Sequence, residues 1–409
     1  MKKLITVLLV AVFALTLVFT LVACGPTNQS EVEKAIVAAE KMTLAELEAA
    51  AKAEFEAAGI KFTAKATTSG VGKVLPKFKE KYTWFDYADF SSSKDTAAAE
   101  EIQATLANDN FYADFSMLQI ASNVTTWVKA GYLLNYVPKN DAEIELSASA
   151  TEPLVGLYAD KLFAYNKSAT DVVLTNIWQL TGKDGTSLKK VKGSSLQDPN
   201  NEGINMAFLT MLTSPESCKT LAKAYKSYFG QDYKDQEGCK NIGYYFIQEF
   251  IKALTQNHAS DSKVLSQTLA KDTTGTVFVV GLNKTKGYAG SENNWHQDLF
   301  YSGVDGDVEG YNGFTYNTYL SIPKTSKLPY TACLFARYIL TQEGFKAGWK
   351  DVGYSSPNAK VAPNVDSAAG VTYVLDITKV VQEDGVYTSK NGADVRKFVA
   401  SVWSAAGRQ

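Results

Sequence analysis

The chain alternates between two kinds of apolar pattern. Between residues 32 and 58, apolar side chains recur every three or four positions among Ala, Glu and Lys, which predicts helix, and Gly59 ends that pattern. Residues 60–66 then alternate as a strand does, and after a loop at 67–72 helical spacing returns as far as Tyr82. The alternation of strands and helices continues without a detectable repeat. It predicts an α/β protein with largely parallel sheets.

The rest of the chain supplies further elements of both kinds. Thr43 and Glu46, three residues apart, fit a capping box at a helix start. Helices are predicted at 95–107, 119–129, 204–211, 215–229, 244–255, 330–341 and 394–405. Strands are predicted around 83–90, 111–118, 152–166, 275–283 and 318–324. The stretch 284–313 is rich in Gly, Asn and Asp and is expected to be a loop or a connection between lobes.

The N-terminal segment has the pattern of a secretion signal. A basic start, Met1–Lys3, precedes an almost unbroken apolar run from Leu4 to Ala23. The run ends in Leu-Val-Ala-Cys-Gly, which resembles a bacterial lipobox with Cys24 as the lipidated first mature residue. A single membrane-spanning anchor is the alternative. The polar stretch after Cys24 favours residues 1–23 as signal peptide, residues 24–34 as tether and a membrane-anchored, extracytoplasmic location.

Composition narrows the class of protein. The 409 residues carry a net charge of −2, with 45% hydrophobic and 21% charged residues, which are ordinary globular values. There is no block of Lys and Arg to provide a basic field, so nucleic acid is not an expected partner. The mature chain is long enough for one large two-lobed unit or for two to three ordinary domains.

The cysteines and histidines give little support for metal or redox chemistry. Cys218 and Cys239 could form a disulfide outside the reducing cytosol, or could be two buried thiols. Cys333 lies in an apolar helical pattern and is expected to be a core thiol. With His258 and His296 as the only histidines, a zinc site is poorly supported, and no metal or cofactor is expected.

The segment Ala66–Lys73, Ala-Thr-Thr-Ser-Gly-Val-Gly-Lys, has the placing of a phosphate loop between a strand and a helix. Its glycines are too close together for a nucleotide-binding P-loop, and Val74 stands where a magnesium-binding hydroxyl is needed. A helix start rich in hydroxyls still suits an anion or a polar oxygen. We therefore expect Thr68, Ser69 and Gly70 to contact a ligand, with plain helix capping as the alternative.

Other candidate contacts lie where predicted strands end. Ser116 and Gln119 stand at the next strand-to-helix corner, although Ser116 could simply cap the helix. Tyr158 lies in the predicted strand 152–166. Asp198 precedes a proline, so it could either meet a ligand or make a routine turn.

The order of these pieces resembles the extracytoplasmic solute-binding proteins of ABC importers, specifically the type II group that contains ferric-ion and polyamine binders. The matching stretches are the lipobox, ATTSGVGK (66–73), ADFSMLQ (113–119), LFAYN (162–166) with Trp178 behind it, LQDPNNEG (196–203), YLSIPK (319–324) and FARYILTQEGFKAGWKDVGYSSPN (335–358). The resemblance covers roughly residues 45–370. It implies two α/β lobes joined by two crossovers, with a ligand cleft between them. Lobe 1 would comprise about 35–153 and 314–358, and lobe 2 about 154–313 and 359–409.

Ferric-ion binders of this group use an adjacent tyrosine pair late in lobe 2. Tyr244 and Tyr245 form such a pair here, but they begin a helical pattern and are better explained as core residues. Where the family's pair would fall, this chain has Asn283, which we take as a ligand contact and which argues against iron. Trp295 and Tyr316, in an aromatic-rich connection, would suit sugar rings or cations.

Another candidate is the acidic run Asp305–Gly310, which resembles half of a calcium loop. Tyr316 stands where a bidentate glutamate would be needed, so an acidic turn is the better explanation. No arrangement of nucleophile, base and acid matches a known catalytic motif, so an enzyme is not expected.

These features together predict a monomeric, lipid-anchored solute-binding protein that closes on a small molecule and docks on an ABC permease. An organic anion or a phosphorylated compound is the expected ligand, followed by a sugar or a metal complex. An extracytoplasmic hydrolase and a surface adhesin are the alternative functions.

Overall fold

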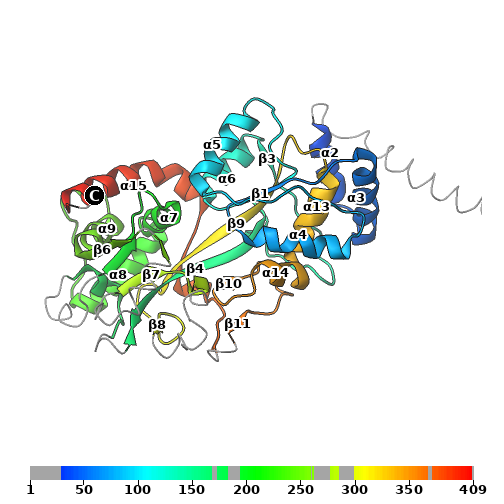
Figure 1. The fold of residues 1–409 in the computed structure, drawn as a ribbon. Helices are drawn as coiled ribbons and strands as arrows, with labels where there is room; N and C mark the ends of the chain where they lie inside the picture. The colour runs from blue at the N-terminus through cyan, green and yellow to red at the C-terminus, as the bar shows by residue number, and fades with distance from the viewer. Residues whose placement is uncertain are drawn as a thin grey trace, which may run out of the picture.

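A computed structural model describes residues 29–167, 173–182, 194–258, 260–261, 277–284, 299–366 and 371–407. The signal segment, Cys24 and Trp295 lie outside these residues. The elements form two lobes, with the N-terminal helices in one and the C-terminal end in the other (Figure 1). Among the described residues, no helix is both long enough and apolar enough to cross a bilayer.

Lobe 1 is built from the N-terminal part of the chain and a late return. Its elements are α2 (Glu31–Ala39), α3 (Leu44–Ala58), β1 (Ala64–Ala66), α4 (Gly70–Lys81), α5 (Asp95–Leu106), β2 (Phe115–Leu118), α6 (Ala121–Lys129), β3 (Leu133–Leu134), α13 (Pro329–Leu340) and α14 (Gln342–Gly348). Aromatic rings fill the core that α4 and α13 share: Phe78 meets Phe335 edge-on, with ring centroids 5.1 Å apart. Such pairs add about 0.5–1.5 kcal/mol beyond the area they bury.

Lobe 2 is built mainly from the middle of the chain and the C-terminal helix. Its elements are η4 (Ile177–Thr181), β5 (Ser194–Gln197), α7 (Gly203–Leu212), α8 (Pro215–Phe229), α9 (Ile242–Ala253), β6 (Leu254–His258), β7 (Val277–Val280), η6 (Leu282–Lys284), β8 (Leu299–Tyr301) and α15 (Gly385–Ala405). Trp178 is fully buried at the centre of its core and donates from Nε1 to the Leu221 carbonyl at 3.0 Å.

Two long strands, β4 (Val155–Asn166) and β9 (Gly313–Pro323), run through both lobes. They pair with each other antiparallel and lie in the middle of one sheet with the order β1-β2-β9-β4-β7-β5-β6 (Figure 1). A third connection leads through β13 (Val381–Gln382), which pairs with β9, into α15. The structure confirms the predicted α/β fold with two lobes joined by crossovers. The sheet is mixed and not largely parallel, because β4 and β9 pair antiparallel with each other and with β7 and β2, respectively.

Side chains on one face of the crossover strand β9 contribute to the cores of both lobes. On one face of β9, Phe314 enters the core of lobe 2 and Leu320 the core of lobe 1. Tyr316 and Thr318 lie between them on the same face, because successive residues of a strand point to opposite sides. This part of β9 therefore forms the floor between the two cores.

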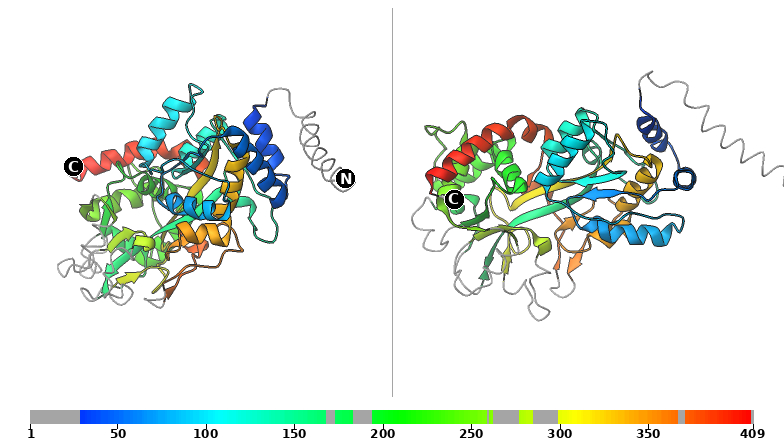
Figure 2. Two further views of the ribbon diagram at one scale, coloured as in Figure 1. Left: turned by 45° about the vertical axis from the view of Figure 1, so that its right-hand side comes forward. Right: turned by 45° about the horizontal axis from the view of Figure 1, so that its top comes forward.

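The C-terminal helix α15 ties the lobes together on one side. It packs against α7 and α9 of lobe 2 and also against α6 of lobe 1, and both views of Figure 2 show it bridging them. The contact with α6 is close: a Cβ built on Gly385 would lie 2.4 Å from Thr125 Oγ1 and 2.9 Å from the Ala121 carbonyl oxygen. Only a glycine fits there without a shift of one helix.

The N-terminal helix differs from the prediction. The pattern from 32 to 58 forms two helices rather than one, because Thr43 starts α3 with a full capping box to Glu46. The predicted end at Gly59 is confirmed, with φ +60° in the left-handed region. The strand predicted at 60–66 is shorter, since β1 covers only Ala64–Ala66.

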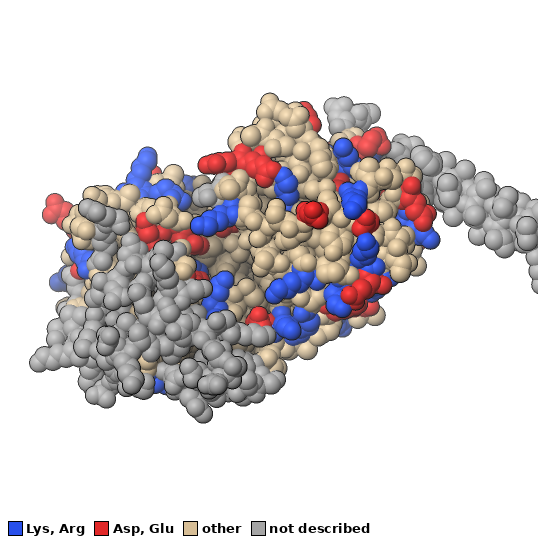
Figure 3. Space-filling view, in the orientation of Figure 1, with Lys and Arg blue, Asp and Glu red and all other residues tan. Residues whose placement is uncertain are grey.

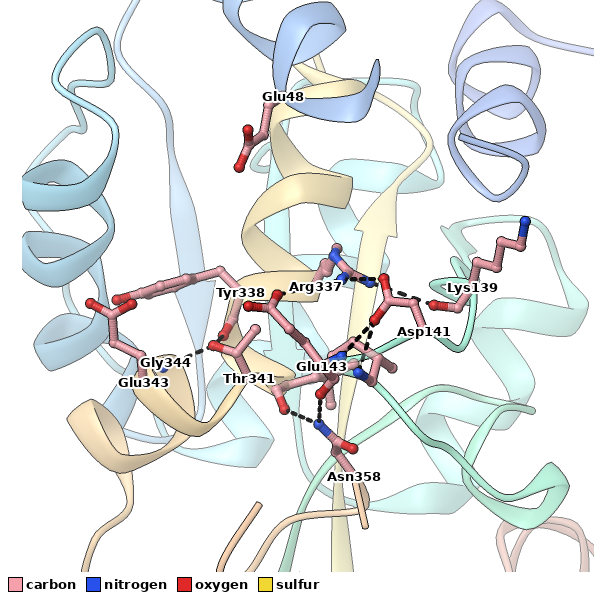
Figure 4. A network of polar contacts seen from close by, with 12 residues as sticks. Glu48, Lys139, Asp141, Glu143, Arg337, Tyr338, Thr341, Glu343, Gly344 and Asn358 are labelled. Atoms are coloured by element: carbon pink, nitrogen blue, oxygen red, sulfur yellow. Dashed lines mark hydrogen bonds and ion pairs between the residues drawn. The ribbon is translucent and has the colours of Figure 1, made fainter. Parts of the chain in front are cut away.

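The motif after α13 is held by a polar network in lobe 1 (Figure 4). Asn358, which is 1% exposed, accepts from the Glu145 backbone N–H and donates to the carbonyls of Glu143 and Leu340. The guanidinium of Arg337, only 5% exposed, donates to Asp141 Oδ2 at 2.7 Å. These contacts fix the Ser-Pro-Asn turn to the loop 139–146 and are structural.

The expected lobe boundaries stay predictions. The packing adds one detail, since Val361 packs against the core of lobe 1 although the sequence assigns residues beyond 358 to lobe 2.

Candidate ligand-binding site

The carboxyl ends of strands from both lobes meet at the middle of the molecule. In lobe 1, the parallel strands β1 and β2 end just before Thr67 and Gln119, and Thr67 Oγ1 accepts a hydrogen bond from the Gln119 backbone N–H at 3.1 Å. In lobe 2, β5 is parallel to both β6 and β7. Ligands of open α/β sheets bind outside such strand ends. We call this region, with the floor formed by Tyr316 and Thr318, the lobe junction.

The loop Thr67–Gly70 forms the wall of the junction on the lobe 1 side. Thr68 Oγ1 accepts hydrogen bonds from the Gly70 backbone N–H at 3.3 Å and from the Trp349 indole at 3.2 Å, so this hydroxyl is already occupied. Ser69 is exposed and makes no capping hydrogen bond to α4. The Ser69 hydroxyl is therefore accessible to a ligand from solvent.

The two lobes touch at Ile120 and Gly203. A Cβ built on Gly203, at the start of α7, would lie 2.8 Å from Ile120 Cδ1. Ile120 has φ +52°, a left-handed conformation that is rare for a β-branched residue. Backbone strain of this kind costs on the order of 1–3 kcal/mol and concentrates at ligand sites and switch regions. Gln119, the predicted contact, is the residue just before this one.

Two carboxylates lie on the two sides of this contact. Asp95 is the first residue of α5 in lobe 1, and Glu202 precedes α7 in lobe 2. Burial and the charge of Glu202 raise the pKa of Asp95 to about 7, against a hydrogen bond from Thr67 that lowers it. The Oδ1 atom of Asp95 is buried and has no hydrogen-bond partner in the part of the chain that the structure describes. Glu202 accepts from Gln197 Nε2 at 3.2 Å.

The floor holds one buried cation that is already paired. Lys161 on β4, 4% exposed, donates to Asn205 Oδ1 at 3.1 Å and lies 3.4 Å from Asp261 Oδ1. Tyr316 stands close by, and burial, Tyr354 and Asp261 raise the pKa of its phenol well above the usual range. Tyr316 therefore remains a neutral hydroxyl that can donate or accept.

On the other face of β4, Asp160 holds the turn that follows β7. Its Oδ1 accepts from the Leu282 backbone N–H at 3.3 Å, and burial raises its pKa to about 8. Next to this turn, Asn283 Nδ2 donates to the hydroxyl of Tyr354 at 2.5 Å. Asn283 is thus held beside a tyrosine, and the sequence does not indicate this pairing.

The remaining predicted contacts take other places. Ser116 is fully buried in the sheet, where its Oγ lies 2.8 Å from Ser321 Oγ across β9. Tyr158 packs partly buried against the core between α5, α6 and β9. The carboxylate of Asp198 accepts from Asn200 and Asn201 within its own turn, which agrees with the turn alternative. Trp295 lies outside the described residues.

The carboxylates of the predicted acidic turn are all bonded to other groups of the protein. Asp305 Oδ2 accepts from the Tyr301 backbone N–H at 2.8 Å, Asp307 pairs with Lys379, and Glu309 accepts from Asn176 Nδ2 at 3.0 Å. Within the described ranges, no group of three or more His, Cys, Asp or Glu side chains is arranged to hold a metal ion.

The cysteines and the tyrosine pair have structural places. Cys218 and Cys239 are partly buried free thiols in this structure, and their disulfide stays a prediction, whereas Cys333 is the buried core thiol that the sequence predicts. Tyr244 and Tyr245 are buried in α9, which supports their interpretation as core residues.

Asp95, Glu202 and Lys161 are the junction residues that the sequence does not indicate. An acidic residue at a helix start is ordinary, and Lys161 stands in a strand whose neighbours are apolar. Only the meeting of the lobes shows that they share one region.

No protein-family model matches the chain, and no curated protein sequence matches it either. Solved structures do match over most of the chain. Iron-bound HitA from Pseudomonas aeruginosa is 12% identical with a TM-score of 0.59, over 84% of this chain and 99% of that one. AfuA from Actinobacillus pleuropneumoniae with fructose-6-phosphate is 16% identical at 0.57, over 85% and 98%, and MotA from A. tumefaciens B6 with glucopine is 15% identical at 0.55, over 84% and 99%.

Identities this low show the fold and nothing finer. The ligands of these three proteins also differ from one another, so they do not select a ligand for this chain. Sequence pattern, lobes, crossovers and structural neighbours agree: the chain has the two-lobed fold of the type II periplasmic solute-binding proteins.

Proposed function

We propose that this chain is an extracytoplasmic solute-binding protein of an ABC importer, anchored through Cys24, which closes its lobes on a small polar ligand at the lobe junction. The observation that carries the proposal is the convergence of strand ends from both lobes on one floor, with Thr67 on one side and Glu202 on the other. Because each lobe supplies polar groups, a ligand between them would contact both only when the lobes are shut, and would shift the population toward that state.

An ABC permease is the proposed membrane partner, and the protein is proposed to act as a monomer without catalysis. On the face of lobe 1 that Figure 3 shows, Lys and Arg are interspersed with Asp and Glu, so the charges there do not indicate a second, highly charged partner. An extracytoplasmic hydrolase of the same fold is the second candidate in principle, but no described feature favours it.

The expected organic anion fits the junction poorly. Lys161, its buried cation, is bonded to Asn205 and Asp261, whereas Asp95 and Glu202 add negative charge. An anion would have to rely on backbone N–H groups and hydroxyls such as that of Ser69. The charges at the junction therefore do not support the anion.

A thermal-shift screen of residues 25–409 against amines, sugars, phosphates, amino acids, polyamines and metal ions tests the function. A ligand at 100 times its Kd stabilises the folded state by about 2.7 kcal/mol, which raises the melting temperature. Ser69→Trp should block the junction and reduce that shift without lowering the stability of the free protein. Ser227→Trp, at an exposed position of α8, is the matched control and should leave the shift unchanged.

If a ligand stabilises the Ser69→Trp variant as much as the wild type, the binding site does not include the loop Thr67–Gly70. Ester or glycoside cleavage without any ligand-dependent stabilisation would favour the hydrolase instead.

A further inference from the structure

Two carboxylates, one from each lobe, lie at the lobe junction, where Lys161 is already bonded to Asn205 and lies beside Asp261. Asp95 belongs to lobe 1 and Glu202 to lobe 2, and neither forms an ion pair within the described part of the chain. Every buried or half-buried carboxylate needs compensation, because removal from water disfavours its charged form. We therefore ask which kind of ligand would compensate the charges of Asp95 and Glu202.

A short series of contacts connects the two carboxylates. Thr67 hydrogen-bonds to Asp95 and also accepts from the Gln119 backbone N–H at 3.1 Å. The next residue, Ile120, touches Gly203, which directly follows Glu202. The charge of Glu202 contributes to the raised pKa of Asp95, in agreement with this proximity.

Helix capping is the ordinary explanation for an acidic residue at a helix start, and it does not account for this pair. The N-terminus of α5 has no side-chain capping hydrogen bond, and that of α7 has none either. Glu383 provides the contrast. Its two oxygens accept from the backbone N–H groups of Ala121, at the start of α6, and of Asn317, so both oxygens have partners inside the protein.

Two buried polar atoms at the junction have no hydrogen-bond partner among the described residues. One is Asp95 Oδ1 itself. The other is Thr318 Oγ1, which belongs to a side chain that is 0% exposed on the same face of β9 as Tyr316. Buried polar atoms in native proteins are almost always hydrogen-bonded, so both mark hydrogen-bonding capacity that the protein leaves open.

We propose that Asp95 and Glu202 form a charge gate that keeps the lobes apart until a ligand with an ammonium group binds between them. The inference rests on the proposed function and specifies the ligand class of the same site as a small organic amine. Without the ligand, two like charges approach each other as the lobes close, which raises the free energy of the closed state. With it, the positive charge of the ammonium lies between the two carboxylates and offsets their repulsion, and its N–H groups donate to atoms that have no other partner among the described residues.

An organic amine fits the junction better than a metal ion does. Calcium and similar ions take six or more oxygen ligands, whereas an ammonium group is satisfied by two or three acceptors. The neutral ring of Tyr316 on the floor adds a surface that attracts organic cations. A metal ion remains an outcome that the experiment can reveal.

The variants Asp95→Asn and Glu202→Gln remove one charge each and keep the shape. In residues 25–409 without any ligand, each is expected to shift the protein toward the closed state, seen as a smaller radius of gyration in small-angle X-ray scattering. Glu100→Gln, at an exposed position of the same helix α5, is the matched control and should leave the radius unchanged.

Probe pairs that differ only in charge test the ligand class. We would use 1,4-diaminobutane with 1,4-butanediol, glucosamine with glucose, and glucose 6-phosphate and calcium as further arms. At least one amine should stabilise the protein where its hydroxyl analogue does not, and either substitution should weaken that amine by roughly 10- to 100-fold, as expected when a charged hydrogen-bond acceptor is lost.

If the radius of gyration is the same in both variants as in the wild type, the charge gate is wrong. The ligand class is overturned if no amine stabilises the protein, or if a sugar, phosphate or calcium ion stabilises wild type and Asp95→Asn alike. That last outcome would leave the proposed function standing, because a ligand would still bind between the lobes. The absence of stabilisation by every class in the wider screen would instead remove the proposed function itself.

Discussion

The indole of Trp349 and the hydroxyl of Thr68 join two distant parts of lobe 1. Trp349 Nε1 donates to Thr68 Oγ1 at 3.2 Å, and the ring occupies the space where a side chain of residue 70 would begin. Gly70 of the segment 66–73 is thus needed because a larger residue would clash with the Trp349 ring. A loop that resembles a nucleotide site is shaped by a tryptophan at the end of α14.

Gly70→Ala is expected to destabilise lobe 1. The new Cβ would lie 2.4 Å from Trp349 Cε2, well inside contact distance, so the ring or the start of α4 has to move. Overpacking of this kind costs about 1–3 kcal/mol, and the Thr68 hydrogen bond is expected to be lost with it. Urea denaturation followed by circular dichroism measures the change in the free energy of unfolding.

The control for this substitution is Gly392→Ala on α15, where nothing lies within 4 Å of the added Cβ. It should stabilise the protein by about 0.5–1 kcal/mol through helix propensity. Equal effects of the two substitutions would contradict the packing argument.

Asn358→Ala is expected to be among the more damaging single changes in lobe 1. The side chain makes four hydrogen bonds to backbone groups, three of which belong to Glu143, Glu145 and Leu340 (Figure 4). Loss of the partner of a buried polar group costs about 1–3 kcal/mol, and several groups lose theirs here. We expect a loss of about 3 kcal/mol or more in the free energy of unfolding.

Asn108→Ala is the comparison, because that exposed amide makes one hydrogen bond, to the Ala104 carbonyl at 2.8 Å. Its effect should stay below about 1 kcal/mol. If Asn358→Ala is equally mild, water must replace the amide, and the turn would not depend on it.

The three cysteines of the folded body are expected to differ in reactivity. Cys218 and Cys239 are partly exposed and Cys333 is fully buried. Burial raises the pKa of all three thiols, so alkylation should be slow at neutral pH, and Cys333 should react only after unfolding. Mass spectrometry of residues 25–409, alkylated before and after denaturation without reductant, distinguishes these cases. A mass lower by two hydrogens, with Cys218 and Cys239 unreactive throughout, would establish the disulfide instead.

The periodic parts of the fold were predictable, and long-range contacts were not. Helices such as 215–229 and the capping box at Thr43 follow from local spacing, which the chain carries within a few residues. Ser116 shows the limit. Its partner, Ser321, is 205 residues away, and a strand end alone does not tell whether a serine faces a ligand or another strand.

The candidate site shows the same limit more sharply. The sequence indicates the loop at Thr68 because hydroxyls and glycines gather there, but it does not reveal that Trp349 already occupies the threonine. Asp95 and Glu202 are 107 positions apart in the sequence, and each is unremarkable alone. Their significance comes from the approach of two lobes, which no local pattern encodes.

The stability of the protein is expected to fall as the pH rises from about 4 to about 8. Burial raises the pKa of Asp160 from 3.8 to about 8, and that of Glu383 from 4.5 to about 7. Between these values the unfolded carboxyl has lost its proton while the folded one keeps it. The folded state therefore binds more protons, and the free energy of unfolding decreases with pH.

Asp160→Asn should remove part of this dependence. The amide oxygen can still accept from the Leu282 backbone N–H, and no charge has to be buried at high pH. Urea denaturation at pH 4.5 and pH 8 should give a difference between the two pH values that is smaller in the variant than in wild type. Asp86→Asn is the control, because hydrogen bonds from Lys79 and Lys61 lower the pKa of Asp86 to about 2. That carboxyl is ionised in both the folded and the unfolded protein at pH 4.5 and at pH 8, so its replacement should leave the difference between the two pH values unchanged. A variant at position 160 with the full wild-type pH dependence would show that Asp160 is ionised in the folded protein, and that its burial is compensated by a group still to be found.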